Sequence, residues 1–78
     1  MATAAEKKRI VVAYLERCID YSDAMLEKYR QRLQAASAME QLSIQDQISH
    51  WTAYRAFNAY AIDEITTTTE IDDWFEDD

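Results

Sequence analysis

The chain contains no glycine and no proline among its 78 residues. Tight turns between β-strands favour Gly or Asn at positive φ angles, and phosphate-binding loops need Gly because the backbone must approach the ligand closely. The absence of both residues therefore argues against a β-rich fold and against a nucleotide-binding loop. Helices joined by short polar turns are the fold class that remains.

Cysteine is nearly absent as well. The single Cys18 excludes an intrachain disulfide and fits a reducing compartment. It lies close to Leu15, Ile19 and Ser22 on a helical pattern, so we expect it to be a buried small apolar side chain rather than a nucleophile.

Long apolar runs and excess positive charge are also missing. No apolar run approaches the length that crosses a bilayer, and the first residues lack the charged-then-apolar order of a secretion signal. We therefore expect a cytoplasmic protein. The net charge of −7 and pI near 4.5 argue against direct binding to nucleic acid or to an anionic membrane, because both are bound through Lys and Arg.

What the chain does contain is helical periodicity. Residues 4–38 predict one long helix, because apolar or small residues recur at alternating spacings of four and three, as in a coiled coil or bundle. These positions are Leu15, Ile19, Ser22, Leu26, Tyr29, Leu33 and Ala36. The polar Ser22 allows an alternative in which residues 20–23 interrupt the helix and a three-helix bundle forms.

A break is predicted at residues 39–43, because Ser43-Ile-Gln-Asp46 resembles a helix N-cap followed by an acid. A second helix over residues 44–65 then carries a broad apolar stripe. Its members are Ile44, Ile48, Trp51, Tyr54, Phe57, Ala61, Ile62 and Ile65. Arg55 and Asn58 lie at the edge of this stripe, either as rim residues or, for Asn58, as an interface residue that fixes the helix register.

The C-terminal segment differs sharply from the rest. Residues 63–78 hold eight of the fifteen acids and no base, so residues 1–62 have a net charge of +1 and the last sixteen residues −8. Thr67-x-x-Glu70 has the form of a capping box, which predicts a short helix over residues 70–76. Ile71, Trp74 and Phe75 would share one face of it. We therefore divide the chain into a helical hairpin domain, 1–66, and an acidic–aromatic tail, 67–78.

The two predicted helices differ in length, so residues 4–15 should project beyond the second helix if the two pack antiparallel. The tail leaves the hairpin at the same end. Its apolar residues could cover this projecting part, while Asp72, Asp73 and Glu76 approach Lys7, Lys8 and Arg9. Helices with such wide apolar stripes commonly pair as a four-helix bundle, so a homodimer is expected.

Chemistry-bearing motifs are weak. His50 and Asp46 are one turn apart, but two ligands are too few for a metal site, and the tail lacks the spaced acids and Gly of a calcium loop. We expect no catalytic site, no cofactor and no metal site, because the chain shows no nucleophile–base motif and is too short to enclose a substrate pocket. Asp46 is expected to act as a capping residue.

The sequence therefore predicts a non-enzymatic, protein-binding module such as an adaptor, a subunit chaperone or an inhibitor. Most of the aromatic side chains should form the core, with Tyr21 and Tyr60 outside it. The candidate partner-binding residues are Tyr21, Tyr60, Ile71, Asp72, Asp73, Trp74 and Phe75. Two alternatives remain: an acidic mimic of nucleic acid that occupies a basic groove, and a purely structural dimerisation module.

Overall fold

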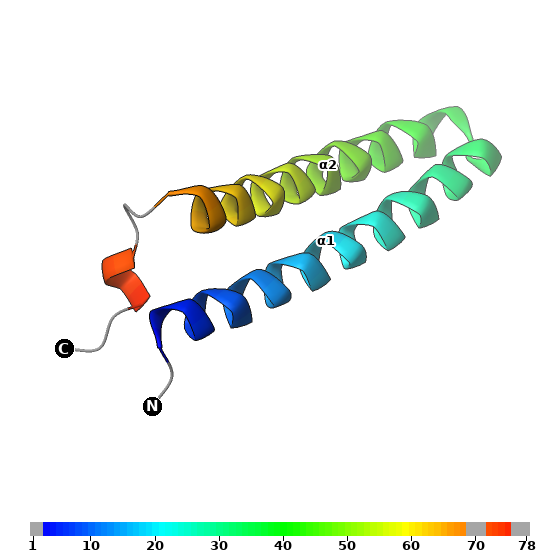
Figure 1. Ribbon diagram of the computed structural model, residues 1–78. Helices are drawn as coiled ribbons and strands as arrows, with labels where there is room; N and C mark the ends of the chain where they lie inside the picture. The colour runs from blue at the N-terminus through cyan, green and yellow to red at the C-terminus, as the bar shows by residue number, and fades with distance from the viewer. Residues whose placement is uncertain (1–2, 69–71, 76–78) are drawn as a thin grey trace.

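The protein is an all-helical hairpin, as predicted. The computed structural model describes residues 3–68 and 72–75. Helix α1 (Ala4–Ala35) and helix α2 (Ala38–Thr67) pack antiparallel, and a short 3₁₀ turn, η1 (Asp72–Phe75), lies beside the start of α1 (Figure 1). No strand occurs in the described residues. The predicted helix over residues 70–76 stays a prediction, because residues 70, 71 and 76 lie outside this part.

Helix α1 is continuous through Ser22, so the three-helix alternative with a break at residues 20–23 is wrong. The Ser22 hydroxyl donates a hydrogen bond of 2.8 Å to the carbonyl oxygen of Cys18, one turn earlier. This bond satisfies the hydroxyl inside its own helix. The small side chain, 0% exposed, can therefore face α2 directly.

The turn between the helices lies at Ala36 and Ser37 rather than at residues 39–43. Both residues are extended, with φ/ψ of −83°/148° and −67°/165°, which any L-amino acid adopts without strain. No residue of the described chain has a positive φ angle. This explains how a hairpin forms without glycine.

Ser37 is the N-cap of α2. Its side-chain oxygen accepts a hydrogen bond from the backbone N–H of Glu40, and the Gln41 side chain donates to the Ala36 carbonyl. Ser37-x-x-Glu40 is a capping-box sequence, and Thr3-x-x-Glu6 starts α1 in the same way. The predicted cap at Ser43 is wrong, because the chain already has a cap six residues earlier. Asp46 accordingly lies within α2 and caps nothing.

Threonine side chains accompany the end of α2. The hydroxyls of Thr66 and Thr67 donate back to the carbonyl oxygens of Ile62 and Asp63, at 2.8 and 2.6 Å. Such bonds compete with the regular helical ladder, and the helix ends at Thr67.

The two helices are nearly equal in length, because α2 begins six residues earlier than predicted. Ile65, near the end of α2, therefore lies beside Ala5, Lys8 and Val12 at the start of α1. The predicted projection of residues 4–15 beyond the second helix is wrong.

The core is a single narrow line. Only four described residues are buried: Ser22, Leu26, Asn58 and Ile65. The other positions of the predicted α1 seam, such as Leu15, Ile19 and Leu33, are half-buried. Cys18 is also half-buried rather than fully covered. In α2 the central position belongs to Asn58, whereas Phe57, which was expected in the stripe, is 67% exposed.

The molecule is long and thin, measuring 55 × 19 × 19 Å. Its radius of gyration is 17.1 Å, whereas a compact domain of this length has about 11.5 Å. Its accessible surface of 5944 Å² exceeds the roughly 4,900 Å² expected for a folded monomer of this mass. The isolated hairpin thus leaves much of its surface uncovered.

Replacement of Ser37 by Ala should destabilise the hairpin by about 1 kcal/mol, because the N–H of Glu40 loses its acceptor. The matched control is Ser43→Ala. Ser43 is exposed inside α2, so Ala should leave stability unchanged or raise it slightly. Urea unfolding followed by circular dichroism measures both, and a larger loss for Ser43→Ala would contradict the position of the turn.

Candidate functional site

Large apolar side chains are exposed along one side of the hairpin, which we call the aromatic flank. Its members in α1 are Ile10, Tyr14 and Tyr21, and those in α2 are Met39, Leu42, Tyr54, Phe57 and Tyr60. The exposed fractions range from 39% for Tyr54 to 86% for Met39. Five of the seven tyrosine, tryptophan and phenylalanine residues expected mainly in the core are thus exposed, and the other two are half-buried.

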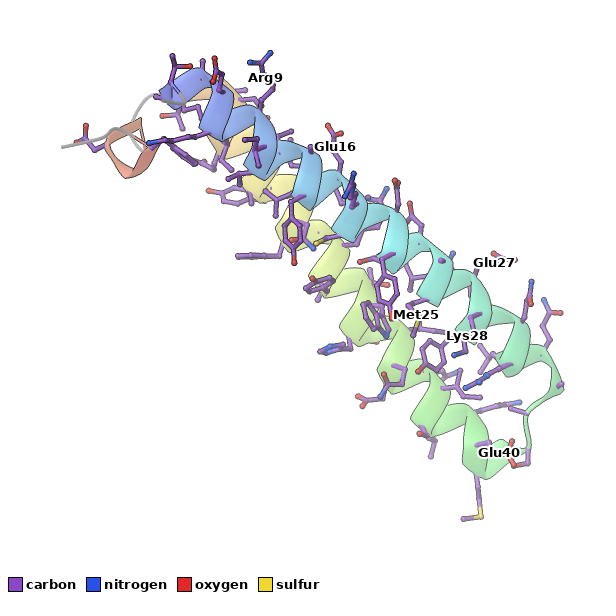
Figure 2. All side chains as sticks on the ribbon, turned by 90° about the horizontal axis from the view of Figure 1, so that it is seen from below. Arg9, Glu16, Met25, Glu27, Lys28 and Glu40 are labelled. Carbon is purple, nitrogen blue, oxygen red and sulfur yellow. The ribbon has the colours of Figure 1, made fainter. Side chains whose placement is uncertain are left out.

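Helical spacing places the α1 members on one face. Ile10, Tyr14 and Tyr21 are four and seven residues apart, and Arg17 and Lys28 continue the same line. This line is a second stripe, about a quarter-turn away from the buried line through Ser22. Figure 2 looks toward this side of the hairpin, with Met25 and Lys28 between the helices and Glu16 and Glu27 directed away from α2.

Helix α2 carries a second stripe of its own. Spacings of three and four residues place one set of α2 residues on a common face. These residues are Met39, Leu42, Ala53, Phe57 and Tyr60. Asp46, His50 and Glu64 occupy the remaining positions of this stripe. Because α2 has apolar residues on two faces, the hairpin can bury only one of them.

Ring contacts join the stripes of the two helices. Tyr21 of α1 meets Trp51 of α2 edge-to-face, with ring centroids 5.5 Å apart, and Trp51 meets Tyr54 in the same way at 5.6 Å. His50 packs against the other side of Trp51 at 5.8 Å. Such edge-to-face pairs are favourable because the positive ring edge meets the negative ring face. The half-buried Trp51 is therefore the centre of the flank.

Tyr14 extends the flank toward the N-terminus of α1. A hydrogen bond with the Cys18 side chain, followed by the charges of the Cys18 and Tyr54 side chains, raises the pKa of Tyr14 above its usual value. The Tyr14 hydroxyl is therefore uncharged at neutral pH. It can serve a partner as a hydrogen-bonding group on an apolar ring.

An apolar groove of ≈ 420 Å³ lies at the end of the flank next to the termini. Val11 and Leu15 of α1 and Phe57 and Ala61 of α2 form its walls, and Phe75 of η1 lies against it. The tail thus contacts the region that the sequence suggested, through Phe75. It leaves Ile10, Tyr14, Phe57 and Tyr60 mostly exposed.

Charges of opposite sign are unevenly divided between the two edges of α1, although Arg9 and Arg30 lie on the mainly acidic edge. Glu16, Asp20, Asp23 and Glu27 follow one another at helical spacing on the edge away from the aromatic flank, and all four are exposed. On the flank side the charged residues of α1 are mainly basic, namely Arg17, Lys28 and Arg32, with Glu6 as the exception next to Ile10. The side chains of Lys28 and Arg32 also lie over the ring of Tyr29, at 5.9 and 5.6 Å.

The opposite side of the hairpin is polar. Asp23 and Arg55 form an ion pair across the two helices there, with both side chains about half exposed. An exposed pair of this kind contributes ~0–1 kcal/mol.

The predicted partner-binding residues fall into three groups. Tyr21 and Tyr60 are exposed on the flank, at 57% and 63%. In η1, Asp73 is exposed and Phe75 is half-buried. Ile71, together with the side chains of Asp72 and Trp74, lies outside the part that the structure describes.

Sequence reasoning missed Met39, Leu42 and Phe57 as members of an exposed surface, and it expected Ile10 and Tyr14 to be left uncovered by the second helix but covered by the tail. The signal was present as a second line of three- and four-residue spacings in each helix. It was hidden because the same residues widen the first stripe, and a misplaced turn left Met39 and Leu42 outside any helix.

The described residues contain no group of three or more His, Cys, Asp and Glu side chains that could hold a metal ion. His50 is exposed and packs on Trp51. No helix in the described ranges is long and apolar enough to cross a membrane. The chain matches no protein-family model, no curated protein and no solved structure.

Among the residues that the structure describes, Asn58 is the one buried side chain with an unsatisfied polar atom. It is 4% exposed, and its Nδ2 has no hydrogen-bond partner. Leaving a buried donor unpaired costs roughly 1–3 kcal/mol. The amide therefore weakens the helix pairing.

We expect Asn58→Leu, a change to an apolar side chain of similar shape, to stabilise the hairpin by about 1 kcal/mol. Ser22→Ala is the matched control, because the Ser22 hydroxyl already has a partner and its removal relieves no unpaired group. Thermal unfolding followed by circular dichroism tests both variants. A lower melting temperature for Asn58→Leu would show that the amide has a partner that the hairpin alone does not provide.

Proposed function

We propose that this protein is a non-catalytic binding module that uses the aromatic flank and the acidic C-terminal tail to hold other protein. The observation that carries the proposal is the exposure of eight large apolar side chains on one side of the hairpin. Large apolar side chains gathered on one exposed side are typical of interaction sites. Tyr and Trp are also enriched among the residues that dominate binding energy.

The charged residues of the flank indicate what kind of partner surface fits it. A partner surface that meets α1 must accept Arg17, Lys28 and Arg32 beside Tyr14 and Tyr21, so acidic and apolar groups fit it best. The tail has the opposite character, with Asp73 exposed near Phe75, and it suits a basic rim around an apolar pocket. These two surfaces meet at the groove formed by Val11, Leu15 and Phe57.

One observation favours the nucleic-acid mimic as a second candidate. Glu16, Asp20, Asp23 and Glu27 form a row of exposed carboxylates along a rigid helix, with about 4.5–6 Å of axial rise between successive members. A basic groove could accept such a row. The row is short, however, and Asp23 is paired with Arg55, so this candidate ranks second.

The test is affinity capture from a lysate of the source cells, with bound proteins identified by mass spectrometry. A defined protein, either a different protein or a second copy of this chain, should be retained by the intact chain. Tyr21→Ala/Phe57→Ala should reduce its recovery at least tenfold, because the centre of the flank is lost. Trp74→Ala/Phe75→Ala should weaken recovery if the tail contributes.

Gln45→Ala is the control, because Gln45 is exposed on the polar side of α2. Equal recovery by all variants would refute the flank and the tail as binding surfaces. Recovery that falls steeply between low and high salt, and that depends on Glu16 and Glu27 rather than on Tyr21, would instead support the mimic, because apolar contacts respond weakly to ionic strength.

A further inference from the structure

We infer that the aromatic flank is covered by a second copy of this chain, in a twofold dimer whose axis runs along the helices, so that α1 of each copy packs antiparallel against α2 of the other. The inference rests on the proposed function and names the occupant of its binding surface. Three observations carry it: the area of the flank, its unevenly divided charge, and the matching heights of its residues.

The area suits a stable dimer. A face of 55 by 19 Å is on the order of 1,000 Å², and each partner in a standard-sized interface buries roughly 800 Å². The accessible surface of the lone hairpin exceeds that expected for a folded monomer of this mass, and this excess disappears if the face is covered. Four helices packed in this way form a bundle, the usual arrangement in which helices with two apolar stripes bury both.

The charge identifies the partner as the chain itself. On the flank the charged residues of α1 are mainly basic, Arg17, Lys28 and Arg32 against the single Glu6, whereas those of α2 are acidic, Asp46 and Glu64. Contact between α1 of one copy and α2 of the other therefore joins opposite charges. Rotation about an axis perpendicular to the helices would instead place α1 on α1 and α2 on α2, which joins like with like.

The heights of the residues match as well. The turn at Ala36 and Ser37 and the ring contact of Tyr21 with Trp51 place these two rings at about the same level in the hairpin. A twofold axis along the helices preserves levels, so Tyr21 of one copy comes opposite the segment of α2 around Ala53 in the other. Lys28 likewise comes within one turn of Asp46. Within its own chain Asp46 forms no ion pair with any described residue.

The proposed dimer also places the described chain ends of both copies at the same end of the bundle. Both copies place the start of α1 and the end of α2 at the same end of the bundle, so the two η1 turns lie near one another. The turn residues Ala36 and Ser37 of both copies lie together at the opposite end. This separation of the two ends allows the orientation to be measured directly.

The first experiment measures the mass of the purified chain by light scattering at several protein concentrations. The expected mass is twice 9.1 kDa, and the melting temperature should rise with protein concentration, because association stabilises the folded state. Tyr21→Glu should raise the dissociation constant at least tenfold. Gln45→Glu, on the polar side, should leave it unchanged.

The second experiment exchanges charges. Lys28→Glu and Asp46→Lys should each weaken the dimer several-fold, and the double variant should recover most of the loss. Recovery requires that the two positions face each other across the interface. Additive losses would contradict the proposed pairing of α1 with α2.

The third experiment measures orientation. In a Cys18→Ser background, spin labels at Ala38→Cys should lie on the order of 20 Å apart, since neighbouring helices in a bundle are 8–10 Å apart. Labels separated by nearly the 55 Å length of the molecule would overturn the proposed axis.

A monomeric mass with a melting temperature independent of concentration would overturn the second copy as occupant. The proposed function would survive that result only if Tyr21→Ala/Phe57→Ala still abolished capture of a different protein. If the flank variants changed neither the mass nor the capture, both proposals would fall.

Discussion

A pair of helices can bury only one line of side chains on each member, and this limit governs the whole molecule. Leu26 and Ile65 are the only described hydrophobic residues that the hairpin buries, beside Ser22 and Asn58. Every further apolar residue is left at the edge of the contact or on the surface. The hairpin therefore depends on capped helix ends and local helical bonds for its shape, and it has little core from which to gain stability.

The same limit explains why the two sides of the hairpin differ in charge and in aromatic content. In Figure 2, Glu16 and Glu27 lie with Arg9 on the edge of α1 away from α2, whereas Lys28 lies on the other edge. Helical spacing places Tyr14, Tyr21 and Arg17 on the same edge as Lys28. The ion pair of Asp23 with Arg55 marks the solvated side. A helix whose charge divides in this way presents two chemically different surfaces, and only one of them is suited to contact with aromatic side chains.

Much of the fold could be predicted from spacing alone. The absence of Gly and Pro and the regular steps through Leu15, Ser22 and Leu26 indicated two helices, and the structure contains them. The turn could not be placed correctly, because Ser37 and Ser43 both precede an acid by three residues and sequence spacing does not rank them. Since the turn sets the length of α2, its misplacement also produced the incorrect projection at the start of α1.

The site was predicted only in part, because the exposure of Phe57 depends on the fact that Asn58 rather than Phe57 faces α1. Apolar periodicity left Asn58 open between the rim and the interface, and the structure places it in the interface.

The extended conformation of Ala36 and Ser37 has a consequence for the pathway of assembly. Neither residue is a helix breaker. The bend between α1 and α2 is therefore maintained mainly by the hydrogen bond from the Glu40 N–H to the Ser37 side chain and by the packing of the two helices. If both residues became helical, α1 and α2 would join into one continuous rod. Two such rods could then exchange their second halves, each rebuilding with the other chain the contacts that the hairpin makes with itself. A glycine at this link would favour the bend and resist that exchange, and the sequence contains none.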